Sequence, residues 1–374
     1  MEEVEFGSKQ NFVFAILLLC AWTFIGLPVV QAGERFEFFN GIRSLGMGGA
    51  QIAIVNDETA LVANPAALGR LRDRFLTYAD LEVEIGTNNV GNGTLSPLTA
   101  LEPDSTFDAL DGHLNDPSRT SVQIFPSFVL PNFGLGVFAR LQSTAEVTDT
   151  ASTTGYDLQY QQDVAVVTGF NFRFFDGIFK LGFNIRAINR TEAKGTFDAT
   201  GATNVDLDTI GTEGAGVATD VGTLLTFPIR YLPTFSVVAR DVGNTSFDLS
   251  SGSLNSLDGT PETKDMSVDV GFAIAPILGK GTRSLFSVEL RDVLYDESEN
   301  GDEDLIRRLH GGLEINIEDA LFLRGGMNQG YWTAGLELAF AYYQLQFAAY
   351  GEDIGDGTTA REDRRYIMKV AFRF

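Results

Sequence analysis

The sequence contains almost none of the residues from which covalent or metal chemistry is usually built. Its only cysteine, Cys20, lies in an apolar stretch near the amino terminus, and His113 and His310 are its only histidines. The rest of the chain therefore has no disulfide and no thiolate metal site. Leu19 precedes the cysteine, where a lipoprotein signal needs a small residue. We predict no enzyme, no bound metal and no cofactor.

Long hydrophobic runs are also absent beyond the amino terminus. Phe12–Ile25 is apolar but short for a membrane-spanning helix. Val30-Gln31-Ala32 follows with residues that signal peptidase accepts, so we predict a signal peptide over residues 1–32. The first ten residues carry three glutamates and one lysine, whereas a signal peptide begins with positive charge. A start codon assigned too early explains this, and a retained anchor is the alternative.

Positive charge is scarce. The chain has 27 lysines and arginines against 50 acidic residues, for a net charge of −23. Such a chain repels the phosphates of nucleic acids, so we predict no nucleic-acid partner. Subtracting 32 from 374 residues leaves 342, enough for two soluble domains or one large barrel. Because no second long apolar run follows, a mature chain that spans a membrane must do so as a closed barrel.

An alternation of apolar and polar residues begins at Phe75. Leu81, Val83 and Ile85 alternate with Glu82 and Glu84, and segments of about ten residues with this pattern are typical of transmembrane strands. Fourteen candidate strands begin near residues 74, 120, 133, 163, 178, 214, 233, 265, 283, 307, 320, 331, 342 and 364.

The connections between these segments alternate in length. Long connections are predicted at 87–119, 144–162, 193–213, 244–264, 295–306 and 352–363, with short turns between them. Only the turn at Asn328–Gly330 is short where a long loop is due. Outer-membrane barrels have short periplasmic turns and long outer loops in this order. We therefore predict an all-β, 14-stranded antiparallel transmembrane β-barrel over residues 73–374, in the cell outer membrane.

The last strand ends on an aromatic residue. Val370, Phe372 and Phe374 share one face of it, and this ending resembles the signal that barrel-assembly machinery recognises in outer-membrane proteins. We expect that machinery, outer-membrane lipid and lipopolysaccharide to be partners of the chain.

The opposite faces of the strands carry charges of both signs. The predicted set is Arg186, Asp220, Arg240 and Asp269 in one run, and Glu314, Arg324 and Glu337 in another, with Arg173, Glu289 and Lys369 besides. Opposite charges on adjacent strands favour pairing, so we predict an ion-pair ladder in the lumen. The alternative is a charged constriction that selects a solute, although porins usually show rings of one sign.

Residues 33–72 do not have the pattern of barrel wall. They contain Arg43-Ser44-Leu45-Gly46-Met47-Gly48-Gly49-Ala50 and then Asn64-Pro65-Ala66-Ala67-Leu68. This pair of motifs resembles the amino-terminal hatch of the FadL superfamily of long-chain fatty-acid transporters, which includes PorV-type and conjugal-transfer branches. The resemblance covers most of the chain. It implies a 14-stranded barrel whose lumen is plugged by residues 33–72.

The resemblance also implies two functions. One is transport of hydrophobic or amphipathic small molecules, gated by the hatch. The other is a PorV-like role without transport, serving a protein secretion or surface-attachment apparatus. Our candidate hatch and ligand residues are Phe38, Phe39, Leu45, Gly46, Met47, Gly48, Gly49, Asn64, Pro65 and Ala66. The glycines permit close packing or positive φ, and Asn64 before Pro65 favours a turn.

Three other kinds of site fit the sequence poorly. A phosphate-binding loop would need glycine at Gln51. A lipid hydrolase would need a serine beside an outward histidine, whereas His310 is predicted to point inward. The acidic run 296–304 lacks the glutamate that a calcium loop needs at its twelfth position. It is expected to be a solvated outer loop, and weak binding of Ca²⁺ or Mg²⁺ stays open.

Overall fold

The computed structural model describes residues 37–91, 114–150, 153–198, 207–250, 252–295, 305–355 and 360–373. The predicted signal peptide, His113, the acidic run 296–304 and Phe374 lie outside these ranges. Within them, no helix is both long enough and apolar enough to cross a membrane.

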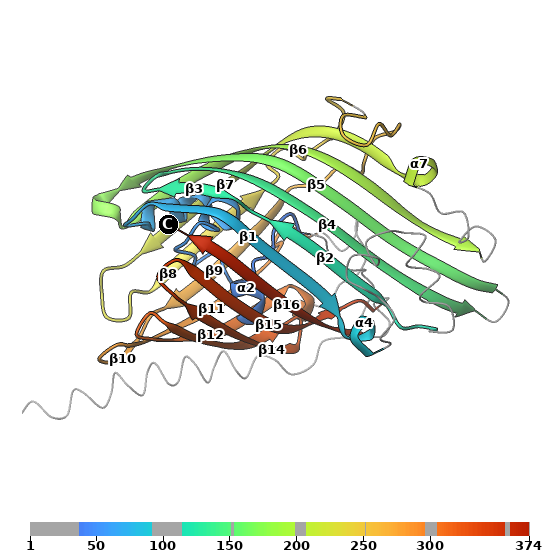
Figure 1. Cartoon of the computed structure of the whole chain (residues 1–374). Coiled ribbons are helices and arrows are strands. Elements are labelled where there is room, and N and C mark those ends of the chain that lie inside the picture. The colour runs from blue at the N-terminus through green and yellow to red at the C-terminus, as the bar shows by residue number, and fades with distance from the viewer. Residues whose placement is uncertain are drawn as a thin grey trace, which may run out of the picture.

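The chain forms one closed antiparallel barrel (Figure 1). Its strands are β1 (Phe75–Gly86), β2 (Ser118–Ile124), β3 (Ser127–Leu130), β4 (Phe133–Thr150), β5 (Thr153–Phe174), β6 (Phe179–Asp198), β7 (Thr212–Thr226), β8 (Thr234–Arg240), β9 (Ser267–Ile274), β10 (Ile277–Gly279), β11 (Thr282–Leu290), β12 (Leu309–Ile317), β13 (Leu321–Asn328), β14 (Tyr331–Ala339), β15 (Tyr343–Asp353) and β16 (Glu362–Arg373). Apart from β2 with β3 and β9 with β10, neighbours along the chain pair in order, and β16 closes the ring on β1.

Two wall positions are each divided by a proline, which lacks the N–H needed by a sheet ladder. Pro126 separates β2 from β3, and both pair with β1 and β4. Pro276 separates β9 from β10, and both pair with β11. The described strands therefore fill fourteen wall positions, which confirms the predicted 14-stranded barrel.

The outer surface of the wall is apolar. On β5, Phe170, Phe172 and Phe174 point outward and are exposed, as are Trp332 on β14 and Tyr366 on β16. On β5 the inward positions between these phenylalanines carry the polar residues Asn171 and Arg173. This separation of faces is the alternation seen in the sequence, with the apolar side turned toward lipid.

The wall is much taller on one side than on the other. Strands β4, β5 and β6 have 18, 22 and 20 residues, whereas β13 has 8. The prediction of a long loop over 144–162 was wrong, because β4 and β5 run on as a paired hairpin up to Thr150 and Thr153. Residues 193–198, predicted as loop, also belong to β6. Gln162 interrupts the apolar face of β5 above Val166, although Val164, Tyr160 and Leu158 continue that face.

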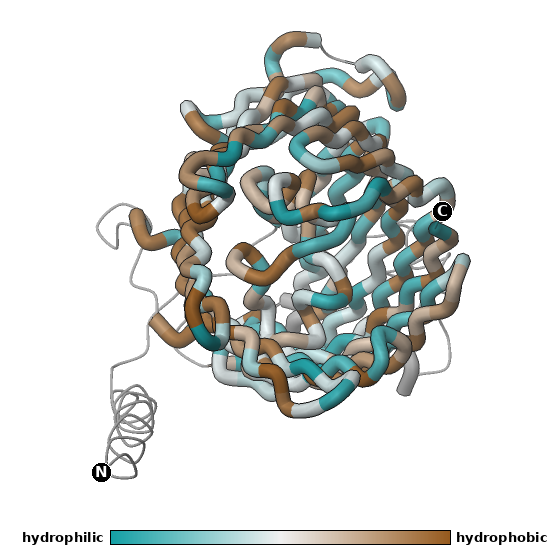
Figure 2. The backbone as a smooth tube through the Cα atoms, turned by 90° about the vertical axis from the view of Figure 1, so that its left-hand side faces the viewer, coloured by the Kyte–Doolittle hydropathy of each residue, from teal (hydrophilic) through white to brown (hydrophobic). Residues whose placement is uncertain are grey.

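Residues 37–71 lie inside the ring. Figure 2 looks into the barrel from the end of the short turns and shows these segments within the wall. We call residues 37–71 the inner segment. It contains α2 (Ile42–Gly46), α3 (Ala60–Ala63) and η1 (Pro65–Arg70). The remaining short helices, α4 (Thr87–Gly91), η3 (Phe175–Gly177), α7 (Leu207–Ile210) and η4 (Leu305–Arg308), lie in connections between strands.

Candidate functional site

One side of the inner segment lies on inward-facing glycines of β12, β13 and β14. A Cβ on Gly312 would overlap the backbone of Met47, and a Cβ on Gly335 would lie 3.1 Å from Gly46 Cα. Gly48 and Gly49 follow with φ of +67° and +87°, a region that favours glycine. The wall and the segment thus meet backbone to backbone, with no side chain between them.

The second motif is held by β6, β7 and β8. Glycines of β6 and β7, Gly182 and Gly222, leave the space that Pro65 and Asn64 occupy. Asn64 Nδ2 donates to Ile52 O at 2.8 Å and to Ser236 Oγ at 2.9 Å, and Asn64 Oδ1 accepts from Ala66 N at 3.0 Å. Asn64 and Ala66 are both fully buried. The amide therefore links the segment to itself and to the wall.

A hydrophobic core joins the inner segment to β4–β7. Phe39 and Leu61 belong to it, together with Phe125 and Phe138 from the wall. Phe38 packs on Phe138 with ring centroids 4.6 Å apart, and the Arg186 guanidinium lies 4.4 Å from the Phe38 centroid. Met47 is fully buried in a separate cluster with Ala53, Ile54 and Ala273.

The charged residues predicted as a ladder lie inside the barrel in pairs. Arg186 Nη2 is 2.6 Å from Asp220 Oδ1, Arg240 Nε is 2.7 Å from Asp269 Oδ2, and Arg324 Nε is 2.7 Å from Glu314 Oε2. Arg324 also contacts Glu337. Arg173, by contrast, is exposed.

Several of these wall charges also bind the inner segment. Arg43 donates twice to Glu314, at 2.9 Å each. Glu289 accepts from the backbone N–H groups of Gln51 and Ile52 at 2.7 and 2.9 Å. Arg240 lies 3.3 Å from the carbonyl of Ala63. The ion pairs therefore link wall strands to one another and also hold the inner segment in the lumen.

His310 has a similar position. Its Nδ1 lies 3.0 Å from Gly48 O, and its side chain is buried. The ring thus contacts the backbone of the glycine motif.

Above the inner segment is an outer cavity of about 540 Å³, which we call the vestibule. The inner segment contributes Phe38, Phe39, Leu45 and Val62 to its apolar lining, and the wall and loops add Ala193, Met266 and Leu294. Around them stand polar side chains of both signs, including Arg186, Asp241, Arg240, Asp269, Arg291 and Glu192. Met47, Asn64 and Pro65 do not line this cavity.

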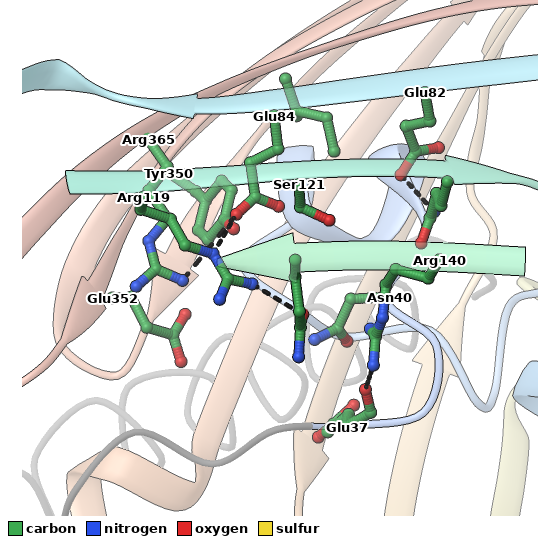
Figure 3. A pocket seen from close by; sticks show the side chains of 13 residues that line it. Glu37, Asn40, Glu82, Glu84, Arg119, Ser121, Arg140, Tyr350, Glu352 and Arg365 are labelled. Atoms are coloured by element: carbon green, nitrogen blue, oxygen red, sulfur yellow. Dashed lines mark hydrogen bonds and ion pairs between the residues drawn. The ribbon is translucent and has the colours of Figure 1, made fainter. Parts of the chain in front are cut away.

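Two smaller cavities lie beside the inner segment. The seam, of about 30 Å³, lies between Glu37 and Asn40 of the segment and polar side chains of the wall (Figure 3). Those wall residues include Glu82, Glu84, Arg119, Ser121, Arg140, Tyr350 and Arg365. The inner cavity, of about 230 Å³, is lined by residues such as Arg43, Glu58, Gln346 and Lys369. Figure 3 shows charged groups of β1, β2 and β16 pointing toward the inner segment.

The terminal strand places Phe372 on the outer face, where its ring centroid lies 6.1 Å from that of Tyr78. Val370 shares that face at half-buried exposure.

Sequence analysis missed the wall residues that receive the inner segment. They are Gly182, Gly222, Gly312, Gly326 and Gly335, with Asn171 and Asn184, whose amides donate to Ala66 O and Leu61 O at 2.9 Å. A usable signal exists, because these glycines occupy inward positions in otherwise alternating strands.

Comparison with known proteins identifies the fold. No protein-family model and no curated protein matches the sequence. Among solved structures, the chain is similar to the CymD monoaromatic hydrocarbon channel, with a TM-score of 0.50, 11% identity, and 89% and 96% of the two chains covered. It is also similar to the toluene transporter TodX of Pseudomonas putida, with a TM-score of 0.50, 10% identity, and 93% and 99% covered. A TodX deltaS2S3 mutant gives a TM-score of 0.53 at 12% identity, over 89% and 98%. The chain thus has the fold of FadL-type outer-membrane barrels, as the sequence resemblance implied.

Proposed function

We propose that this protein is an outer-membrane transport protein for hydrophobic or amphipathic small molecules, and that residues 33–72 are its hatch. The observation that carries this proposal is the vestibule, whose apolar floor of Phe38, Phe39, Leu45 and Val62 is surrounded by charged side chains of both signs. Ligand pockets combine apolar surface with a few polar groups in this way. The fold shared with CymD and TodX, which are described as a hydrocarbon channel and a toluene transporter, supports the same class of cargo.

The charged lining of the vestibule suits an amphipathic ligand better than a plain hydrocarbon. Arg186 lies over the Phe38 ring and between Asp220 and Asp241, which are 2.6 and 2.9 Å from its Nη2. A carboxylate ligand would compete with these aspartates for the guanidinium, while its apolar chain would lie on Phe38 and Phe39. Arginine suits this role because it presents several donors in a fixed plane.

The hatch movement in this proposal is limited to the first part of the inner segment. Residues from Gly46 to Gly69 lie against wall glycines and the apolar core. Glu37 has one backbone contact and one side-chain contact with arginines. Arg140 donates to its carbonyl at 2.7 Å, and Arg291 pairs with its carboxylate at 2.5 Å. Movement of Glu37–Leu45 within the vestibule would require exchange of these contacts. It would also require release of the Arg43–Glu314 pair and of the buried side chains of Phe39, Ile42 and Leu45.

Native mass spectrometry with lipid extraction tests the proposal on the barrel purified from its own host. We expect a stoichiometric apolar or amphipathic molecule, and saturable binding of dodecanoate after it is removed. Phe38→Ala should weaken dodecanoate binding several-fold, because it removes an aromatic ring from the apolar floor. Phe172→Ala is the matched control, since Phe172 lies on the exposed outer face of β5. Absence of any bound molecule and of dodecanoate binding would contradict transport of such cargo.

A second function is favoured by the extent to which the lumen is already filled. Buried ion pairs and glycine contacts fix most of the inner segment, as suits a barrel that serves a secretion or surface-attachment apparatus without transporting a ligand. An empty barrel that forms a defined complex with a secretion-system protein would support this alternative.

A further inference from the structure

The inner segment meets the barrel wall differently in different sectors. Strands β4–β8 hold it by the apolar core and by asparagine side chains, and β12–β14 hold it by glycines. Toward β15, β16, β1 and β2 its apolar contacts are fewer. Ile42 and Leu45 meet Ala348, Tyr350 and Ile367 in a small cluster, and Phe75 of β1 packs against the apolar core. Around this cluster the wall presents buried polar and charged side chains, among them Glu82, Gln123, Gln346, Arg365 and Lys369.

The three cavities follow one another along this polar sector. The vestibule and the seam share the lining residues Glu37, Asn40, Gln142 and Glu352. The seam ends at Glu82 and Ile367, and the inner cavity begins at Ile42 and Lys369. Lys369 Nζ is 4.0 Å from Glu82 Oε2. A single layer of side chains therefore separates the outer cavities from the inner one.

Buried polar atoms along the same line lack hydrogen-bond partners. In the seam these are Asn40 Oδ1 and Arg140 Nε, and in the inner cavity Gln51 Nε2 and Gln346 Oε1. Leaving such an atom unsatisfied costs about 1–3 kcal/mol, and ordered water is the usual partner for buried polar groups in polar cavities. These residues line the seam or the inner cavity, so a small side-chain rotation would let each unsatisfied atom bind water there.

We propose that vestibule, seam and inner cavity are parts of one hydrated passage for inorganic ions and small hydrophilic solutes. It runs between the inner segment and β15, β16, β1 and β2. It is distinct from the hydrophobic cargo proposed above and needs no movement of the glycine-anchored residues. In this structure the passage is closed at its layer of side chains, where Ile42 meets Ile367 and Lys369 meets the carboxylates of β1.

The electrostatics of the closure depend on one lysine. Lys369 Nζ lies 2.7 Å from Asp80 Oδ2 and 4.0 Å from both Glu82 and Glu58. Arg373 also pairs with Glu58, at 2.7 Å. Removing Lys369 leaves an excess of carboxylates at the narrowest point. A ring of negative charge selects for cations.

Conductance of the full-length barrel in planar lipid bilayers in KCl tests the proposal. Lys369→Gln should raise the single-channel conductance several-fold and shift the reversal potential in a salt gradient toward that of K⁺. Ile42→Ser should raise conductance without that shift, because it widens the layer and leaves its charge unchanged. Lys180→Gln is the matched control, since this buried lysine of β6 lines none of the three cavities.

Folding of each variant is checked by its heat-dependent mobility in gel electrophoresis. If Lys369→Gln does not fold, Ile42→Ser decides the question alone. Folded variants that conduct like the wild type and Lys180→Gln would overturn the passage. Dodecanoate binding, measured on the same samples, separates this outcome from a failure of the proposed transport function.

Discussion

The side-chain oxygen of Asn64 occupies the space that a Cβ on Gly222 would need. The two residues are far apart in sequence and belong to the inner segment and to the wall strand β7. The fit is completed by Gly182, against which the backbone of Pro65 and Ala66 lies. The wall is therefore complementary in shape to the inner segment. The contact can be tested from either side, by substituting Gly222 or Asn64.

Gly222→Val should destabilise the barrel by forcing Asn64 and Pro65 out of place. Overpacking of a well-packed core costs about 1–3 kcal/mol, and here backbone must also move. The midpoint of thermal unfolding, followed by gel mobility, measures the effect. Gly279→Ala is the control, because a Cβ there meets nothing within 4 Å. Equal midpoints for the two variants would show that the segment does not depend on this groove.

Asn64→Ala should also lower stability, since it removes three hydrogen bonds of a fully buried amide. Leaving buried partners unsatisfied costs about 1–3 kcal/mol. Urea unfolding in detergent gives the difference. Asn56→Ala is the control, because Asn56 is exposed and only accepts from Arg43. A wild-type urea midpoint for Asn64→Ala would refute the role given to this residue.

Arg324→Met should be among the most destabilising charge changes in the barrel. It leaves Glu314 and Glu337 facing each other in a buried site, with only Arg43 still paired to Glu314. Breaking a buried pair by removing one partner costs about 3–5 kcal/mol. Adding Glu337→Gln should recover part of the loss.

The matched control for that change is Arg283→Met. Arg283 pairs with Asp319, and the two side chains are 56% and 65% exposed. Exposed ion pairs contribute about 0–1 kcal/mol to stability. Similar losses for the two arginines would mean that burial does not set the strength of these pairs.

Two adjacent carboxyl groups of the inner segment should respond to pH in opposite directions. Burial raises the pKa of Glu58, helped by Asp57 and Asp80 against Arg373 and Lys369. Burial also acts to raise the pKa of Asp57, but Arg43, Arg373 and a hydrogen bond from Thr59 outweigh it and lower that pKa.

The sign of each effect follows from linkage. The stabilising contribution of Glu58 is present below its ordinary pKa of 4.5 and is lost as pH rises. The stability of Glu58→Gln relative to the wild type should therefore increase as pH rises. The stabilising contribution of Asp57 is present above its ordinary pKa of 3.8 and is lost as pH falls. The stability of Asp57→Asn relative to the wild type should therefore decrease as pH rises. Urea midpoints from pH 3 upward measure both, and parallel trends would contradict the assignment.

Some features were predictable because they depend on residues close together in sequence. Leu81, Val83 and Ile85 alternate with buried acids along β1, and lipid outside with polar lumen inside imposes that period on each strand. The hairpin at Thr150 and Thr153 was not predicted, because the polar and small residues around its tip (148–155) are typical of a loop, although Leu158 and Tyr160 continue the apolar face of β5.

The sequence by itself determined the barrel, its strand number and the inward position of its charges, because alternation and closure are repeated along the chain. The tertiary structure decided which charges pair, as with Arg43 on Glu314, 271 positions away. It also decided that wall glycines such as Gly312 and Gly335 receive the inner segment. An inward glycine shows only that space is left, and what fills the space depends on a segment brought there by closure of the barrel.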